Sequence, residues 1–419
     1  MTHAQAWTWG IAALATAGVI IRPFGWPEAV WAVAGAVALV AAGLLPVGDA
    51  LAGVGKGTDV YLFLTGMMLL SEVAREEGLF GWMAALATKR ANGSAARLFL
   101  LIYAVGTVVT TFLSNDAAAV VLTPAVAAAV KTAKVEDPLP YLFICAFIAN
   151  AASFVLPISN PANLVIYGAH MPPLLQWLPR FALPSLLSIL ATFAVLRLAQ
   201  NRALAADRIA SEVEFPALTN TGKLAGAGIA VTAAALLVSS ALDVQLGLPT
   251  AICGVATAAS VLAVKRANPW TTVKAVSWAV LPLVAGLFVL VEALAKTGLI
   301  TTISDALHAA AQASATEAGW GAGVLIAFLC NAMNNLPAGL IAGSAVQSAH
   351  LSDRVTSAIL IGVDIGPNLS VTGSLATILW LTALKREGVS VGAGQFLKLG
   401  ALVMPPALLL ALAGLFLVG

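Results

Sequence analysis

The stretch GVDIGPNLSVTGSLATILW, residues 362–380, decides the fold of this chain. It is apolar enough to enter a membrane, but Gly366, Pro367 and the Asn and Ser residues that follow cannot continue a lipid-facing helix. Pro lacks a backbone donor, Gly loosens the backbone, and Asn and Ser compete for backbone hydrogen bonds. Backbone that is not helical survives at membrane depth only where protein or a water-filled cavity satisfies its polar groups. The stretch therefore predicts a broken transmembrane helix that lines a cavity.

The rest of the chain has the composition of an integral membrane protein. Of its 419 residues, 60% are hydrophobic and 10% are charged, and the mean hydropathy is +0.96. That leaves too little polar surface for a water-soluble globule of this size. A span needs roughly 20 apolar residues, so the chain has room for about ten spans in one unit. We therefore expect an all-α, polytopic membrane protein in a lipid bilayer.

Several function classes are excluded by what the sequence lacks. A net charge of +2 gives no basic surface for nucleic acid. The cysteines Cys145, Cys253 and Cys330 stand singly, without the spacing of a disulfide framework or a zinc site. The chain has no GxxxxGK[ST] loop, no HExxH and no nucleophile elbow. We expect a transporter rather than an enzyme, without a cofactor, driven by an ion gradient or by a separate ATPase.

Basic residues gather in a few short loops, which by the positive-inside tendency face the cytoplasm. These clusters are Lys89, Arg90 and Arg97; Arg197, Arg202, Arg208 and Lys223; Lys265, Arg266 and Lys274; and Lys385, Arg386 and Lys398. The long polar stretch 201–223 is predicted to be a cytoplasmic linker. It divides the chain into a first transmembrane half, residues 1–200, and a second half, residues 224–419, a layout common among transporters.

The two halves share two weakly similar segments in the same order. TFLSNDAAAVVLTPAV, residues 111–126, aligns with FLCNAMNNLPAGLIAG, residues 328–343, and the segment from Asn150 aligns with the segment from Asp364 at nearly the same separation. The alignment predicts inverted repeats, each with a re-entrant hairpin and a broken transmembrane helix. We place the hairpins at about 111–130 and 320–347, and the broken helices at about 140–168 and 354–384.

Two carboxylates lie inside these apolar segments. Asp116 follows Ser114 and Asn115, and Asp364 precedes the Gly-Pro break of the second half. A carboxylate at membrane depth costs several kcal/mol unless it is paired, hydrated or protonated, so both are candidates for binding a proton or a cation. The alternative for each is a structural role as a helix cap.

Neutral polar side chains surround the two carboxylates. Their amides and hydroxyls suit an uncharged polyol-like solute or a partly dehydrated small ion, although some of them only stabilise the hairpins. These residues are Asn160, Asn163, Asn331, Asn334, Asn335, Asn368, Ser370, Thr372, Ser374 and Thr377. Cys330 lies in the second hairpin segment and is a candidate ligand for a thiophilic substrate, or else a small buried hydrophobe.

The segments FLSNDAAAVVLTP (112–124), FLCNAMNNLP (328–337) and 362–380 closely resemble the ArsB family of arsenite and antimonite efflux carriers, within the ion transporter superfamily. The resemblance implies an inverted-repeat fold with a scaffold and a moving transport part in the inner (plasma) membrane. It also implies efflux of As(OH)3 or Sb(OH)3 in exchange for protons, hence arsenite resistance, with an optional ArsA-type ATPase partner. Carried over, the site residues are Asn115, Asp116, Asn331, Asn334 and Asn335 in the hairpins, and Ser159, Asn160, Asn163, Asp364, Asn368, Thr372 and Ser374 in the broken helices.

One departure from the superfamily pattern bears on which ion drives transport. Sodium-coupled relatives carry Ser-Asn-Thr at each hairpin tip, whereas this chain has Ser114-Asn115-Asp116 and Asn331-Ala332-Met333. That difference disfavours sodium and favours Asp116 as the group that titrates. The remaining alternatives are a sodium-coupled anion carrier, and a passive membrane subunit of an ATPase-driven pump.

Overall fold

The computed structural model describes residues 2–168, 171–207, 209–210 and 217–418, and it contains helices and no strand within those ranges. The first half holds α1 (His3–Ile21), α2 (Glu28–Ala41), α3 (Val47–Lys56), α4 (Thr58–Glu76), α5 (Leu79–Ala91), α6 (Ala95–Phe112), α7 (Asn115–Ala117), α8 (Thr123–Thr132), α9 (Leu139–Ala151), α10 (Pro161–Tyr167) and α11 (Leu174–Ala199). The second holds α13 (Asn220–Ala241), α14 (Gly247–Lys265), α15 (Pro269–Ala275), α16 (Val280–Lys296), α17 (Leu299–Ala313), α18 (Ala315–Met333), α19 (Asn335–Ala349), α20 (Asp353–Ile365), α21 (Leu375–Arg386) and α22 (Ala393–Val418). The all-α prediction is confirmed.

The helices fit a multi-pass membrane protein. Six in the described part of the chain are long and apolar enough to cross a bilayer: α1, α6, α11, α13, α14 and α22. The pair α15 and α16 together make a seventh candidate, bent by 42° at the break between them. Helices α2 and α9 are apolar but shorter. Helices α10, α20 and α21 are short because breaks that contain glycine, proline, serine or asparagine lie beside them, as the quoted stretch predicts.

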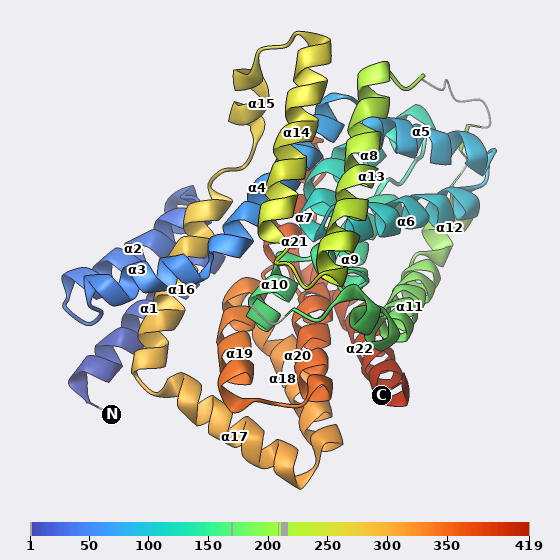
Figure 1. Cartoon of the computed structure of the whole chain (residues 1–419). Helices are drawn as coiled ribbons and strands as arrows, with labels where there is room; N and C mark the ends of the chain where they lie inside the picture. The colour runs from blue at the N-terminus through green and yellow to red at the C-terminus, as the bar shows by residue number, and fades with distance from the viewer. Residues whose placement is uncertain (1, 169–170, 208, 211–216, 419) are drawn as a thin grey trace.

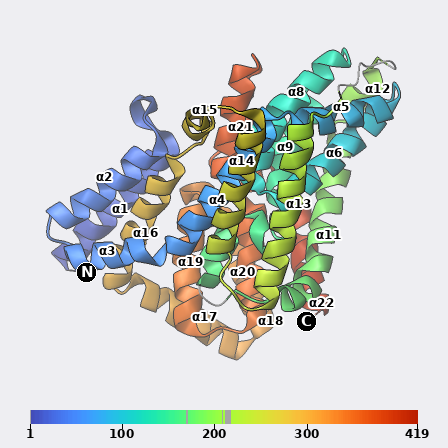
Figure 2. The same cartoon turned by 45° about the horizontal axis from the view of Figure 1, so that its top comes forward.

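The element order repeats. If α7 and α8 are taken as one helix, the elements from α1 to α11 correspond one by one to those from α13 to α22. Figure 1 shows α5 and α8 toward one end of the molecule, and their counterparts α17 and α19 toward the other. In both views α1, α2 and α16 lie together at one side, away from the pair α11 and α22 (Figure 2). This arrangement supports the predicted inverted repeat.

The first hairpin begins earlier than its polar residues indicate. Helix α6 forms its first arm and ends at Phe112, and after a break at 113–114 the chain continues as one helix from Asn115 to Thr132. That second arm contains a π-helical turn, η2 (Ala118–Leu122). The range 111–130 therefore covers little more than the returning arm. Helix α6 is uniformly apolar, so its composition is that of an ordinary span.

The second hairpin is α18 and α19, which meet at Asn334, a residue with φ 75°. The broken helices are α9 with α10 and α20 with α21, interrupted at 152–160 and 366–374. The short helices η3 (Pro157–Ser159) and η5 (Gly366–Leu369) lie inside these interruptions. Between the halves the structure has α12 (Asn201–Ala206), while residues 208 and 211–216 of the predicted linker lie outside the described residues.

Close packing holds the second hairpin against the second broken helix. A Cβ at Gly362 of α20 would lie 2.2 Å from the carbonyl oxygen of Gly323 in α18. Small residues allow membrane helices to approach this closely, and packing rather than hydrophobic burial then drives their association. Helix α20 is consequently fixed along α18, and this places Asp364 near its end beside the other polar breaks.

Candidate functional site

Four helices begin at one pocket. Its lining comes from the first residues of α7, α10, α19 and α21: Asn115, Asp116, Asn160, Pro161, Asn335, Leu336, Leu375 and Ala376. The empty volume around these residues, space open to solvent included, is about 210 Å³. Among the described lining residues none is Lys, Arg or His. Both hairpin tips and both broken helices therefore contribute to one small cavity.

Each of the four helix starts is capped by a polar side chain. Ser114 Oγ accepts from Ala117 N at 3.4 Å, and Asn334 Oδ1 accepts from Leu336 N at 3.3 Å. In the broken helices, Asn160 Oδ1 accepts from Ala162 N at 3.0 Å and Ser374 Oγ from Thr377 N at 3.1 Å. These bonds satisfy one backbone donor at each start. Ser114, Asn334 and Ser374 thus shape the pocket without being among its lining residues.

The capping residues change which positions of the two hairpins correspond to each other. The sequence alignment sets Asn115 opposite Asn331, but the structure gives the same capping position to Ser114 and Asn334. Asn115 and Asn335 are then the matching first residues of the returning arms, and both line the pocket. Asn331 lies one helical turn earlier, in α18.

Asp116 is the acidic residue of the pocket lining. It is half-buried, and no hydrogen bond to its carboxylate is recorded within the described residues. Its own N–H donates to Asn115 Oδ1 at 2.9 Å. The carboxylate lies in the first turn of its helix, where the helix dipole favours a negative charge. It is therefore available to a solute or a proton.

Asp364 lies one layer behind the pocket. It is fully buried, and its Oδ1 accepts a hydrogen bond of 2.6 Å from Nδ2 of Asn160, which does line the pocket. Its second oxygen, Oδ2, has no donor in the described structure. The bond joins the broken helix of the first half to that of the second, so a change of charge at Asp364 acts directly on Asn160.

Asn368 and Asn150 form a second link between the halves. Asn150 Nδ2 donates to Asn368 Oδ1 at 3.0 Å, and Asn368 Nδ2 donates to the Phe147 carbonyl at 3.0 Å. The structure places Asn368 in this link and outside the pocket. Asn150 was missing from the predicted site, although its position opposite Asp364 in the aligned halves is the signal that points to it.

Three other predicted residues hold loops rather than line the pocket. Asn331 Nδ2 donates to the carbonyls of Ala327 and Gly366, while its Oδ1 accepts from Ser370 at 2.7 Å. Thr372 Oγ1 donates to the Asn331 carbonyl at 2.9 Å. Ser159 Oγ donates to the Thr111 carbonyl at 2.9 Å, which fixes the first break against α6.

Two further predicted residues are buried behind the lining. Asn163 Nδ2 donates to the Ser153 carbonyl at 2.9 Å. Cys330 is fully buried, and its thiol lies 3.9 Å from the Val363 carbonyl. Neither is among the residues that line the pocket, and no group of three potential metal ligands occurs in the described ranges. Cys330 is therefore placed as a packing residue between α18 and α20.

The pocket region contains buried oxygens that lack a donor. They are Asn335 Oδ1 at the pocket, together with Asn150 Oδ1, Asn163 Oδ1 and Asp364 Oδ2 behind it. An unsatisfied buried acceptor costs about 1–3 kcal/mol, so such groups usually have a ligand, a proton or a water in the working protein. Of these residues only Asn335 belongs to the described lining, so its Oδ1 is the unpaired acceptor at the pocket for an O–H group of a solute.

A family model described as "Arsenical pump membrane protein" (ArsB) matches residues 11–418. The chain belongs to the ArsB family. An arsenical pump membrane protein of Yersinia enterocolitica is 28% identical over 401 residues, covering 93% of this chain and 92% of the relative. One from Escherichia coli K12 is 29% identical over 366 residues, with 83% and 84% covered. This ArsB member is thus a membrane transport protein of the arsenical pump family.

The fold has a counterpart among solved structures. The YdaH transporter of Alcanivorax borkumensis, whose crystal structure is described as having an unusual topology, is 16% identical and superposes with a TM-score of 0.56. The match covers 88% of this chain and 86% of that one. At this identity the likeness shows a shared fold alone. This chain and that transporter consequently share a fold.

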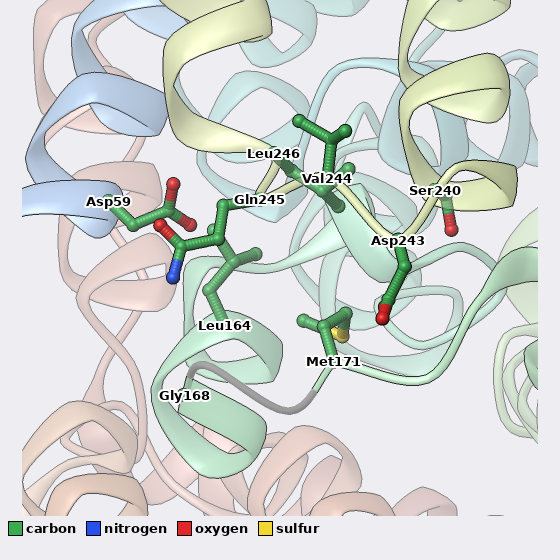
Figure 3. A pocket seen from close by; sticks show the side chains of 9 residues that line it. All are labelled: Asp59, Leu164, Gly168, Met171, Ser240, Asp243, Val244, Gln245 and Leu246. Atoms are coloured by element: carbon green, nitrogen blue, oxygen red, sulfur yellow. The ribbon is translucent and has the colours of Figure 1, made fainter.

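A second pocket of this ArsB chain lies at the opposite end of α10. Its lining comprises Asp59, Leu164, Gly168, Met171, Ser240, Asp243, Val244, Gln245 and Leu246, and its empty volume is about 380 Å³. Figure 3 shows Asp59 and Gln245 on one side and Ser240 with Asp243 on the other. Pro161, the first residue of α10, lines the central pocket, and Gly168, just past its last, lines this one. None of the predicted site residues lines this second pocket.

Proposed function

We propose that this protein exports As(OH)3 or Sb(OH)3 across the inner membrane in exchange for protons, and so confers resistance to arsenite. One observation carries the proposal: four helix starts meet at a pocket whose polar side chains are three amides and one carboxylate, with no cationic side chain among the described lining residues. Family membership supplies the arsenical class of substrate. The absence of a cationic side chain among the described lining residues supports the neutral trihydroxide over an anion as the proposed substrate.

The trihydroxide has both kinds of group that the pocket needs. Its three O–H groups can donate to Asn335 Oδ1 and to the Asp116 carboxylate. Its oxygen lone pairs can accept from N–H groups in the first turns of the surrounding helices, which have no partner within their own helix. The polar groups of a small hydroxide can thus find partners without a cationic side chain.

Proton exchange is assigned to Asp116 and Asp364. Inside a membrane an ionised carboxylate is costly unless it is paired, and protonation removes that cost. Asp116 is open to the pocket, and Asp364 is bonded to the lining residue Asn160. Uptake of protons at these groups from outside, and their release inside when the trihydroxide is loaded, would couple the two flows.

The distribution of basic residues sets the proposed orientation. Lys89, Lys265 and Lys385 lie at the ends of α5, α14 and α21, and the positive-inside tendency assigns these ends to the cytoplasm. The second pocket would then lie on the outer side, because the loop between α13 and α14 is at the other end of both helices. A path outward would run from the central pocket along α10.

Reconstitution of the full chain into proteoliposomes tests the proposal. We expect an imposed proton gradient to drive accumulation of arsenite or antimonite, and collapse of the gradient to abolish it. In Asp364→Asn we expect metalloid flux that no longer follows the gradient. Flux that ignores the gradient in the unchanged protein, and that is unaltered by both Asp116→Asn and Asp364→Asn, would refute proton exchange.

The same vesicles separate the two alternatives. A sodium-coupled anion carrier would respond to a sodium gradient rather than to a proton gradient. A passive subunit of an ATPase-driven pump would show no gradient-driven accumulation until an ArsA-type ATPase and ATP were added. Accumulation by the purified chain alone, with protons as the driving ion, excludes both.

A further inference from the structure

Asp116 has an electrostatic role in the pocket besides carrying a proton. Three helices of at least ten residues begin there: the continuous helix Asn115 to Thr132, α19 and α21. Each helix start has a partial charge of about +0.5, and a partly buried site screens it less than bulk water does. Within the described lining, Asp116 is the one acidic side chain that faces these charges. Its carboxylate therefore opposes the positive field of these helix starts.

An independent feature shows that a ligand belongs in the pocket. Asn335 is 3% exposed, lines the pocket, and has an Oδ1 without a donor. The backbone N–H groups of Leu375 and Ala376, at the start of α21, likewise have no recorded acceptor in the described structure. The pocket thus offers donors and an acceptor together. A ligand that fits carries both oxygen acceptors and at least one O–H.

We propose that Asp116 determines the charge of the transported solute: with its carboxylate the pocket takes a neutral hydroxide, and without it a tetrahedral oxyanion that keeps a proton. This inference rests on the proposed function, because it takes the same pocket as the transport site. The helix starts and Asn335 remain when Asp116 is replaced by asparagine. A monoanion such as dihydrogen phosphate then supplies the missing negative charge, accepts from the helix N–H groups, and donates its O–H to Asn335.

The test is binding of inorganic phosphate to the purified full-length protein in nanodiscs at neutral pH. We expect Asp116→Asn to bind phosphate at least roughly tenfold more tightly than the unchanged protein. Asp116→Glu, which keeps the charge, should bind it no better than the unchanged protein. Asp305→Asn, which removes an exposed carboxylate of α17, is the matched control and should also leave phosphate binding unchanged.

A second change identifies the pocket as the place of binding. Adding Asn335→Leu to Asp116→Asn removes the acceptor, and we expect it to abolish the gained phosphate affinity. Equal phosphate affinity in Asp116→Asn and the unchanged protein, when thermal unfolding shows both to be folded, would overturn the inference. If Asp116→Asn does not fold, Asp116→Ser is measured in its place with the same expected gain and the same refuting result.

The experiments distinguish failure of the proposed substrate from failure of the proposed role of Asp116. If the unchanged protein transports no metalloid but Asp116→Asn gains phosphate binding, the proposed substrate fails and the role of Asp116 stands. If metalloid transport is seen but no variant at Asp116 gains phosphate binding, the proposed function stands and this inference fails.

Discussion

Replacing Asn160 by alanine removes two interactions with one change. The side chain caps α10 through its bond to Ala162 N, and it donates to Asp364 Oδ1 at 2.6 Å. Loss of a cap costs about 1 kcal/mol, and loss of a buried hydrogen bond to a charged acceptor costs about 1.5–3 kcal/mol. The two together are about 2.5–4 kcal/mol, which corresponds to a factor of roughly one hundred or more in the population of the intact site. We expect lower thermal stability and a loss of arsenite flux.

The chain supplies a matched control for this change. Asn268 also precedes a proline, and its side chain caps α15 through a bond of 3.0 Å to Trp270 N, but no carboxylate accepts from it in the described structure. Asn268→Ala should therefore lose only the capping energy of about 1 kcal/mol and keep its flux. Thermal unfolding of both variants in detergent, with metalloid uptake by proteoliposomes, measures the difference. Equal losses in the two variants would refute the reasoning that the bond to Asp364 holds the site.

Three further predictions follow from packing and loop contacts. Gly362→Ala should destabilise the fold by about 1–3 kcal/mol or more, because its Cβ would lie 2.2 Å from Gly323 O. The control Gly321→Ala should be tolerated, because no atom lies within 4 Å of the added Cβ. Equal unfolding temperatures of the two variants would contradict the prediction. Cys330→Ala should keep metalloid transport, because Cys330 is buried and is not among the described residues that line the pocket. If arsenite protected Cys330 from reaction with maleimide, Cys330 would be a ligand of the substrate and the prediction would be wrong. Ser370→Ala should cost about 1 kcal/mol and slow flux by freeing Asn331, whereas Ser348→Ala, which loses a bond within α19, should not change flux.

The sequence indicates the breaks well because their cause is local. Gly366 and Pro367 end α20 where the quoted stretch predicts, and Asn160 with Pro161 begins α10. Each of these features depends on backbone geometry within a few residues, which composition reveals. The same applies to Asp364, whose depth follows from the apolar residues around it.

Other features of the site depend on contacts that the sequence does not contain. Helix α6 has the composition of a span, so nothing local distinguishes it as a hairpin arm. The pocket is also lined by Leu336, Leu375 and Ala376, apolar residues that matter because of where their helices begin. The sequence predicts Asn331 as a ligand residue because it is polar at membrane depth, whereas in the structure its amide bonds to Ala327, Gly366 and Ser370. Tertiary placement decides each case.

The difference between Asn150 and Asp364 shows what joining two repeats in one chain makes possible. These residues occupy matching positions at the ends of α9 and α20, but one is an amide and the other an acid. Because both positions belong to one chain, they can differ: Asp364 supplies an ionisable group that bonds to Asn160, while Asn150 makes a hydrogen bond to Asn368 without a charge.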